Sequence, residues 1–365
     1  MRAPLDTLPG AGWACTACGD CCRGYTLGPV HADIIHALAA SDLPSSWAPA
    51  REGWSEERVS PDGRSVWFLK HVDGHCVFLA DDNRCAVHAS LGEAAKPAFC
   101  REFPFHLSED LTGVRATVRP DCSGFARTFD GDQDATAAAH AAAALPSPLP
   151  RRRFAPEHVA ILPDASLPLA DWLVLERELI EALSGVERLA QAQELVRQRL
   201  FAAAGRPAPQ LNPALGRRAL AAVLAALGMV LPRALNDEGG APHQIVFLQA
   251  RIAELPHLQS VASADPPPLD PRAERYAVLV LRSALHARTW ESAGSVSAGL
   301  GRLALHCAIA QHLAQTTPQG TTATAWARAY IAWSRLFANG LVGWVLTRAK
   351  PALEDALRYG VIAER

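Results

Sequence analysis

Eight cysteines in the first third of the chain are the residues best suited to carry chemistry. Four fall within eight residues and four follow singly: Cys15, Cys18, Cys21, Cys22, Cys76, Cys85, Cys100 and Cys122. Closely spaced thiolates repel one another and oxidise easily, so such a cluster persists inside a cell mainly when a metal ion or an iron–sulfur core neutralises it. We therefore predict that these eight cysteines are metal ligands, with zinc or a 4Fe-4S cluster as the bound group.

The number of sulfurs leaves two arrangements open. Eight exceed the four that one zinc ion or one cubane cluster takes, so either two centres are present or some cysteines are spare. Neighbouring side chains diverge in most backbone conformations, and we therefore expect Cys21 and Cys22 to serve different ligand sets.

Two further side chains lie close to these sulfurs in the sequence. His88 follows Cys85 by three residues, and imidazole suits zinc or iron, so His88 is a ligand candidate with an ordinary histidine as the alternative. Arg101 follows Cys100 directly and could offset the charge of a thiolate cluster or hold a carboxylate through two hydrogen bonds. It is the candidate cofactor-binding residue. The catalytic residues stay unassigned.

Short strands and turns are expected to position the later cysteines. The pattern predicts a helix over 31–40, strands over 65–70 and 76–79 around the Asp73-Gly74 turn, and a hairpin of 103–107 with 114–118. Each of these turns or strand ends delivers a cysteine, which is a common way to bring thiols to one metal.

The composition changes near residue 140, where a proline-rich stretch begins. Beyond it, apolar residues recur at three- and four-residue intervals, which indicates helices over 167–183, 186–203, 213–231, 245–255, 273–288, 301–314, 324–338 and 341–359. The predicted fold class is α+β, with β-hairpins in a small cysteine-rich domain and then an all-α domain. The predicted boundaries are 1–140, a linker over 141–156, and 157–365.

Bulk composition disfavours several kinds of partner. The chain has 35 basic and 37 acidic residues, so it lacks the clustered positive charge that nucleic acid requires. The apolar stretch 219–231 is too short to span a bilayer, which predicts no membrane association. The first residues lack the apolar core of a secretory signal, and we expect a cytoplasmic protein in which disulfides are disfavoured. Cys307, in an apolar helical segment, is expected to pack in the core.

Four linked motifs carry a family resemblance. They are Cys-x-x-Cys-x-x-Cys-Cys at 15–22, Gly-His-Cys-Val-Phe-Leu at 74–79, Arg-Cys-Ala-Val-His at 84–88 and Lys-Pro-Ala-Phe-Cys-Arg-Glu-Phe-Pro-Phe at 96–105. In combination they resemble the CxxCxxCC family of putative zinc- or iron-chelating proteins, also called YkgJ-like cysteine-cluster proteins, over about residues 10–125.

The longer layout, with helices after the cysteines, resembles that of flagellin lysine N-methylases. That resemblance rests on architecture and on Glu274-Arg275-Tyr276 at the opening of a C-terminal helix. It implies iron–sulfur-dependent transfer of a methyl group from S-adenosylmethionine to lysines of a protein substrate such as flagellin. The alternative hypothesis is a non-catalytic module in which zinc or iron serves structure, partner binding or metal handling.

Overall fold

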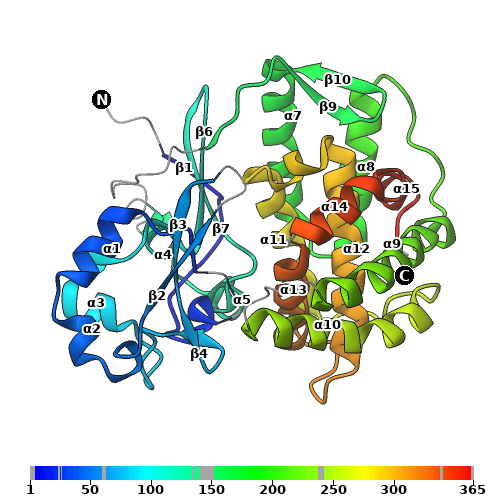
Figure 1. Cartoon of the computed structure of the whole chain (residues 1–365). Coiled ribbons are helices and arrows are strands. Elements are labelled where there is room, and N and C mark those ends of the chain that lie inside the picture. Colours follow the sequence, from blue (N-terminus) through cyan, green and yellow to red (C-terminus); the bar gives the residue numbers. More distant parts are fainter. Residues whose placement is uncertain are drawn as a thin grey trace.

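The computed structural model describes residues 5–23, 25, 27–59, 63–133, 135–136, 138–139, 152–236, 242–337 and 340–362. An N-terminal part of short strands and helices lies beside a helical C-terminal part, with 57% helix and 14% strand overall (Figure 1). This confirms the predicted fold class. The linker expected over 141–156 lies largely outside the described residues, and the domain boundaries stay a prediction.

The N-terminal part contains a four-stranded sheet in the order β1-β7-β6-β8. Its strands are β1 (Leu5–Thr7), β6 (Phe105–Asp110), β7 (Gly113–Val118) and β8 (Arg152–Arg153). β6 and β7 form the predicted hairpin, in which Phe105 pairs with Val118. The Asp110 carboxylate accepts a 2.7 Å hydrogen bond from the Thr112 amide, so the turn closes on a side chain of its own strand.

A small cysteine-containing module is inserted between β1 and β6. It consists of a 3₁₀ turn η1 (Asp20–Cys22), α1 (Ala32–Ala39), α2 (Leu43–Ser46), η2 (Ala48–Ala50), β2 (Ser55–Val59), β3 (Ser65–Leu69), β4 (His71–Val72), β5 (His75–Cys76), α3 (Ala86–Leu91), η3 (Glu93–Ala95) and α4 (Ala98–Glu102). Of the predicted strand over 76–79, only Cys76 lies in a strand, and the rest of that prediction was wrong. β3, which was expected to pair with this segment, pairs with β2. Val77, Phe78 and Leu79 are all buried in succession, so this segment packs from every side and does not alternate as a hairpin strand would.

All eight predicted helical regions form helices in the C-terminal part. The helices from the end of the sheet onward are α5 (Ser123–Thr128), α7 (Leu169–Ala182), η4 (Leu183–Gly185), α8 (Leu189–Ala203), α9 (Pro213–Asn236), α10 (Pro242–Val261), α11 (Pro271–His286), η5 (Thr289–Ala293), α12 (Val296–Gln315), α13 (Ala323–Phe337), α14 (Gly340–Arg348) and α15 (Lys350–Tyr359). The last predicted helix, over 341–359, is divided into α14 and α15. Pro351 is tolerated only in the first turn of a helix, so a new helix begins there. A hairpin of β9 (His158–Leu162) and β10 (Ala165–Pro168) precedes α7 and was not predicted.

The helix α9 is longer than the apolar stretch that suggested it. Within the described residues, the segment Pro213–Arg233 is the one helical stretch whose length and apolar composition would suffice to cross a membrane. Our estimate from residues 219–231, that the segment is too short to span a bilayer, was therefore wrong for the whole helix. A core helix of a globular protein meets the same test, and Leu220, Leu224 and Leu227 on α9 are buried among other helices.

Buried apolar side chains form three clusters. The first joins the sheet to the helices, since Phe105 on β6 shares it with Trp172, Tyr276 and Trp326. The second lies among the helices α9, α10, α12, α13, α14 and α15. The third is the smallest and lies wholly within the inserted module, around Phe78. The N-terminal sheet is thus packed as part of the helical body, whereas the inserted module has a core of its own.

A buried group of four charged side chains fastens the β6–β7 hairpin to the helices. Arg115 and Arg288 both contact the Glu176 carboxylate of α7, at 2.7 Å and 2.8 Å. They also pair with Asp110, at 3.1 Å and 2.8 Å. Burial disfavours the charged form of Asp110, but hydrogen bonds from Thr112 and the two guanidinium groups hold the pKa of Asp110 below its ordinary value.

Candidate metal centre

The segment that carries the first four cysteines folds back on itself in a 3₁₀ turn. Gly19 adopts φ +70°, and the Cys22 amide donates to the Gly19 carbonyl at 2.9 Å. The Cys21 and Cys22 sulfurs lie 4.0 Å apart. These neighbouring side chains do not diverge here, because rotation about the Cα–Cβ bonds lets both sulfurs lean toward the same side of a tight turn. That they serve different ligand sets stays a prediction.

Arg23 attaches this turn to the rest of the inserted module. Its guanidinium donates to the Cys18 carbonyl at 3.0 Å and to Asn83 Oδ1 at 2.7 Å. Its backbone forms an isolated bridge with His75, directly before Cys76. Sequence reasoning missed Arg23, although its position directly after the cysteine pair was a usable signal.

Two turns bring Cys76 and Cys85 into the same neighbourhood. Cys76 ends the β4–β5 hairpin, and the chain then returns through a turn in which the Ala80 amide donates to the Arg84 carbonyl at 2.9 Å. Leu79 pairs with Cys85 in an isolated bridge, so Cys85 returns beside the segment that follows Cys76. A tight turn thus delivers Cys85 to the neighbourhood of Cys76.

Five thiols influence one another's pKa values, and we call them the first sulfur group. Its members are Cys21, Cys22, Cys76, Cys85 and Cys100. A hydrogen bond with Cys21 lowers the pKa of Cys22, but a hydrogen bond with Cys76, burial and nearby thiolates outweigh it and raise that pKa to about 12. Burial and the charges of Cys22, Cys85 and Cys21 raise the pKa of Cys100 well above its ordinary value. A bound cation would therefore lower the thiol pKa values of this group and offset the repulsion among its thiolates.

Cys18 and Cys122 interact at the start of α5, and we call them, together with Cys15 next to Ala14, the second sulfur group. Burial raises the pKa of Cys122 to about 11, and the charge of Cys18 adds to this effect. A Cβ atom on Gly124 would lie 3.1 Å from the Ala14 carbonyl oxygen and 3.5 Å from the Cys122 sulfur. Gly124 thus permits the segment around Cys15 to lie directly on the first turn of α5.

The sulfurs are gathered but do not form a coordination shell. All nine cysteines carry free thiols, and Cys307 is buried in the helical core as predicted. Among the residues that the structure describes, no three His, Cys, Asp or Glu side chains meet closely enough to hold an ion. The individual ligands therefore stay a prediction. The donor chemistry does fit, because a set made only of thiols suits zinc, iron or an iron–sulfur cluster.

The two candidates that are not cysteines differ in their surroundings. His88 is exposed on α3, one turn beyond Cys85, and its role as a ligand stays a prediction. Arg101 donates to the Ala94 carbonyl at 3.1 Å, on the exposed side of α4. Lys96 was not singled out from the sequence, yet its charge lowers the pKa values of Cys21 and Cys100 against the opposing effects. It lies in the conspicuous Lys-Pro-Ala-Phe-Cys motif, which was the available signal.

Side chains from distant parts of the chain support the cysteine segment. Arg335 on α13 donates to the Asp20 carbonyl at 3.3 Å and stacks its guanidinium over the Tyr25 ring at 4.2 Å. The Tyr25 hydroxyl donates to the Asp121 carboxylate at 2.9 Å, and Arg119 binds the same carboxylate. Apart from the Arg119–Asp121 pair, sequence spacing could not reveal these contacts, because they join residues 96 to 315 positions apart.

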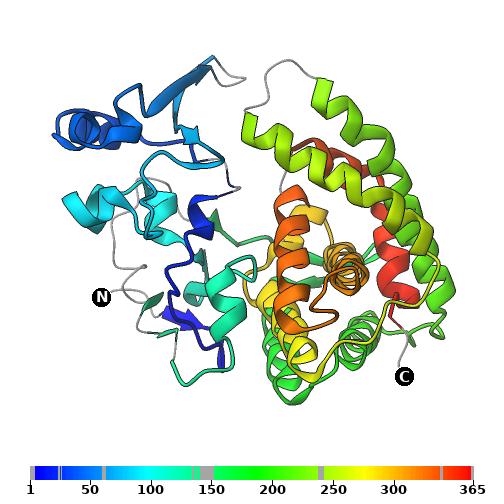
Figure 2. The same cartoon turned by 90° about the horizontal axis from the view of Figure 1, so that it is seen from below.

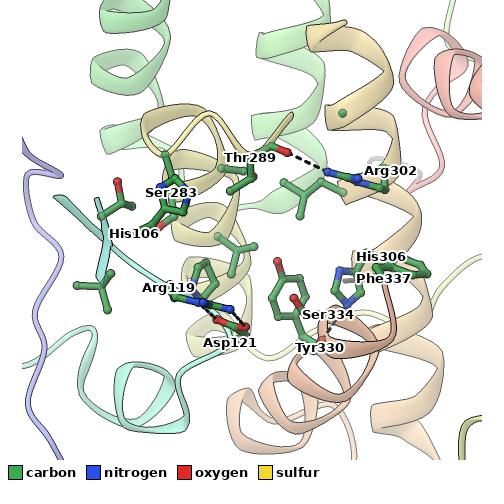
Figure 3. Close-up of a pocket in the computed structure, with 18 of the residues that line it drawn as sticks. His106, Arg119, Asp121, Ser283, Thr289, Arg302, His306, Tyr330, Ser334 and Phe337 are labelled. Carbon is green, nitrogen blue, oxygen red and sulfur yellow. Dashed lines mark hydrogen bonds and ion pairs between the residues drawn. The ribbon is translucent and has the colours of Figure 1, made fainter. Parts of the chain in front are cut away.

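A cavity of about 340 Å³ lies between the end of the β6–β7 hairpin and the helices α11, α12 and α13 (Figure 3). The Arg119–Asp121 pair forms one side, and Arg302, His306 and Tyr330 face it. Burial lowers the pKa of His306 to about 3, so this imidazole is neutral and donates its Nε2 hydrogen to the Tyr330 carbonyl at 2.8 Å. The cavity has the size of a small-molecule site. Two of its lining residues, Pro120 and Asp121, directly precede Cys122 in the chain.

The residues that carried the methylase resemblance have structural partners. The Glu274 carboxylate accepts a 2.7 Å hydrogen bond from the Leu189 amide at the start of α8. The Tyr276 hydroxyl donates to the Pro120 carbonyl at 2.8 Å and so anchors the turn that leads into Cys122. Both contacts account for these side chains without a catalytic role.

Comparison with known proteins supports the cysteine-rich part of the chain. Residues 14–123 match the family model CxxCxxCC, described as a putative zinc- or iron-chelating domain. No curated protein and no solved structure matched the chain. The resemblance to the CxxCxxCC family is thus confirmed for residues 14–123, whereas the layout resemblance to flagellin lysine N-methylases is not supported.

Proposed function

We propose that residues 14–123 bind zinc or iron through the five-sulfur group Cys21, Cys22, Cys76, Cys85 and Cys100. The observation that carries this proposal is the 4.0 Å contact of the Cys21 and Cys22 sulfurs inside the matched domain, with the other three thiols interacting electrostatically with this pair. Four thiolates complete the coordination of one zinc ion or one 4Fe-4S cluster, so the group contains enough donors for either.

The second group, Cys15, Cys18 and Cys122, would form a separate and incomplete centre. Three protein ligands leave one coordination position open, and an open position is typical of catalytic sites, whereas structural sites are closed. The cavity beside Asp121 favours a second candidate function, in which this centre acts on a small molecule held there. Methyl transfer from S-adenosylmethionine is one form of that function, and it rests on the layout of the chain alone.

An anaerobic preparation of the full-length protein tests metal binding. Iron and zinc are quantified by elemental analysis, and visible absorbance reports an iron–sulfur cluster. We expect Cys76→Ser to lower the metal content through the first group and Cys122→Ser to lower it through the second. Cys307→Ala is the matched control, because this buried cysteine lies outside both groups, and it should retain the full metal content.

Each outcome separates the alternatives. Colourless protein with about two zinc ions per chain would indicate a zinc module, whereas metal that a mild chelator removes without unfolding would indicate metal handling. Protein that is reconstituted anaerobically and still holds neither metal would contradict the proposal. Titration of the same preparation with S-adenosylmethionine tests the methyl-transfer hypothesis, which fails if no binding is measured.

A further inference from the structure

A second cavity, of about 330 Å³, opens where the cysteine segment meets the helices α5, α10 and α13. The cysteine-containing part and the helical part lie side by side there (Figure 2). Its wall carries four arginines from three different helices: Arg127, Arg251, Arg328 and Arg335. Arg335 also holds the Asp20 carbonyl, directly before Cys21, so the cavity borders the first sulfur group.

The positive charge of this cavity is only partly balanced. Within the described part of the chain, Arg251 pairs with Glu254 at 2.5 Å, and Asp20 is the one carboxylate on the wall. Arg335 also lowers the pKa of Asp121 through its charge, but three carboxylates against four guanidinium groups still leave a net positive charge. Such a charge in a concave site attracts anions.

Two of the arginines are free to bind a ligand. Arg127 and Arg328 are exposed, and within the described residues neither side chain makes a hydrogen bond or an ion pair. The Nε atoms of Arg251 and Arg335 are buried and likewise lack a hydrogen-bond partner among the described residues. Buried donors without partners are costly, so these two guanidinium groups retain unused hydrogen-bonding capacity beside the cavity.

The shape and chemistry of the site narrow the class of ligand. Guanidinium groups bind phosphate and carboxylate oxygens in pairs, and several converging arginines favour the higher charge of a phosphate. Phe247 and Ile331 add apolar surface to the wall. A cavity of this volume accommodates a small molecule. A nucleic-acid strand would need a long basic surface, which the nearly balanced charge of the chain does not favour.

We propose that this four-arginine cavity binds a small phosphate-bearing molecule in contact with the cysteine segment. The inference is independent of metal binding, since it rests on the arginines and on the cavity alone. Because Arg335 joins the cavity to Asp20, the ligand would also fasten the cysteine segment to α13.

Calorimetric titration of the full-length protein at constant ionic strength tests this proposal. The probes are phenyl phosphate, inorganic phosphate, and phenol as the uncharged analogue. We expect phenyl phosphate to bind with a Kd of about 1 mM or tighter, phosphate more weakly, and phenol not at all. The double variant Arg127→Gln/Arg328→Gln should weaken phenyl phosphate binding at least about tenfold, because both charges face the cavity.

A matched double variant controls for the change in net charge. Arg199→Gln/Arg218→Gln removes two exposed arginines from α8 and α9, away from this cavity, and should bind phenyl phosphate as the unaltered protein does. Equal affinity of the unaltered protein and the Arg127/Arg328 variant would overturn the proposal, as would an equal loss in the control. Tighter binding of a single-stranded oligonucleotide than of phenyl phosphate would overturn it in favour of nucleic acid. Metal content measured on the same samples keeps this result separate from the proposed metal-binding function.

Discussion

The inserted cysteine module and the helical body are stabilised by different means. The helical body buries two extensive apolar clusters, and several of its largest side chains, such as Trp172 and Trp326, are inaccessible to solvent. The module has one small cluster around Phe78 and strands as short as two residues. A small core contributes little stability, and natural domains of this kind commonly depend on metals or disulfides. The proposed metal binding therefore predicts that the module depends on its ligand more strongly than the helical body does.

Metal removal should produce the largest difference between the two regions. Structural zinc supplies about 10–16 kcal/mol of apparent binding free energy to small metal-dependent domains, so its removal is expected to have a large effect. We expect a strong chelator to abolish hydrogen-exchange protection in β4 and β5 while α12 keeps its protection. Mass spectrometry of the full-length protein measures both regions in one sample. Unchanged protection of β4 and β5 after complete metal loss would show that the module is stable alone.

The buried charges at the junction give the next largest effect. Glu176→Gln leaves Arg115 and Arg288 without a full counter-charge, and breaking such a buried network costs about 3–5 kcal/mol. Urea unfolding should show this loss in the helical transition, because the sheet shares its core with the helices. Glu178→Gln changes an exposed residue on the same helix and should stay within about 0.5 kcal/mol of the unaltered protein. Equal effects of the two variants would contradict the role of the junction.

Acid should weaken the support of the cysteine segment by a smaller amount. Burial opposes ionisation of Asp121, but Arg119 and Tyr25 outweigh it and lower the pKa of Asp121. A group with a lowered folded pKa stabilises above its unfolded value, about 3.9, and loses that contribution as the pH falls through the folded pKa. The stability difference between the unaltered protein and Asp121→Asn should therefore shrink as the pH falls below about 5.

Denaturant unfolding between pH 6 and pH 3 measures this difference. Asp171→Asn is the control, because Asp171 is exposed on α7, away from the cysteine segment. A difference between the unaltered protein and Asp121→Asn that does not vary with pH would show that the carboxylate contributes no charge-dependent stability.

Regular elements were predictable where the sequence pattern was periodic over many residues. The eight helical regions and the β6–β7 hairpin followed from apolar spacing and a turn signal. The strand over 76–79 was misassigned because a short apolar run does not reveal which segment will pair with it. The β9–β10 hairpin was missed for a related reason, since five- and four-residue strands give a weak signal beside long helices.

The cysteine spacing by itself indicated metal binding, because thiolates at two-residue intervals favour a counter-charge wherever they lie. The spacing of apolar residues by itself likewise determined the helical character of the second half. Only the tertiary structure placed the Cys21 and Cys22 sulfurs in contact, and put Arg23, Lys96 and Arg335 around the cysteine segment. It alone placed four arginines from three helices on one cavity. Local spacing is fixed along the chain, whereas these arrangements depend on contacts between residues far apart in sequence, which form only when the cores pack.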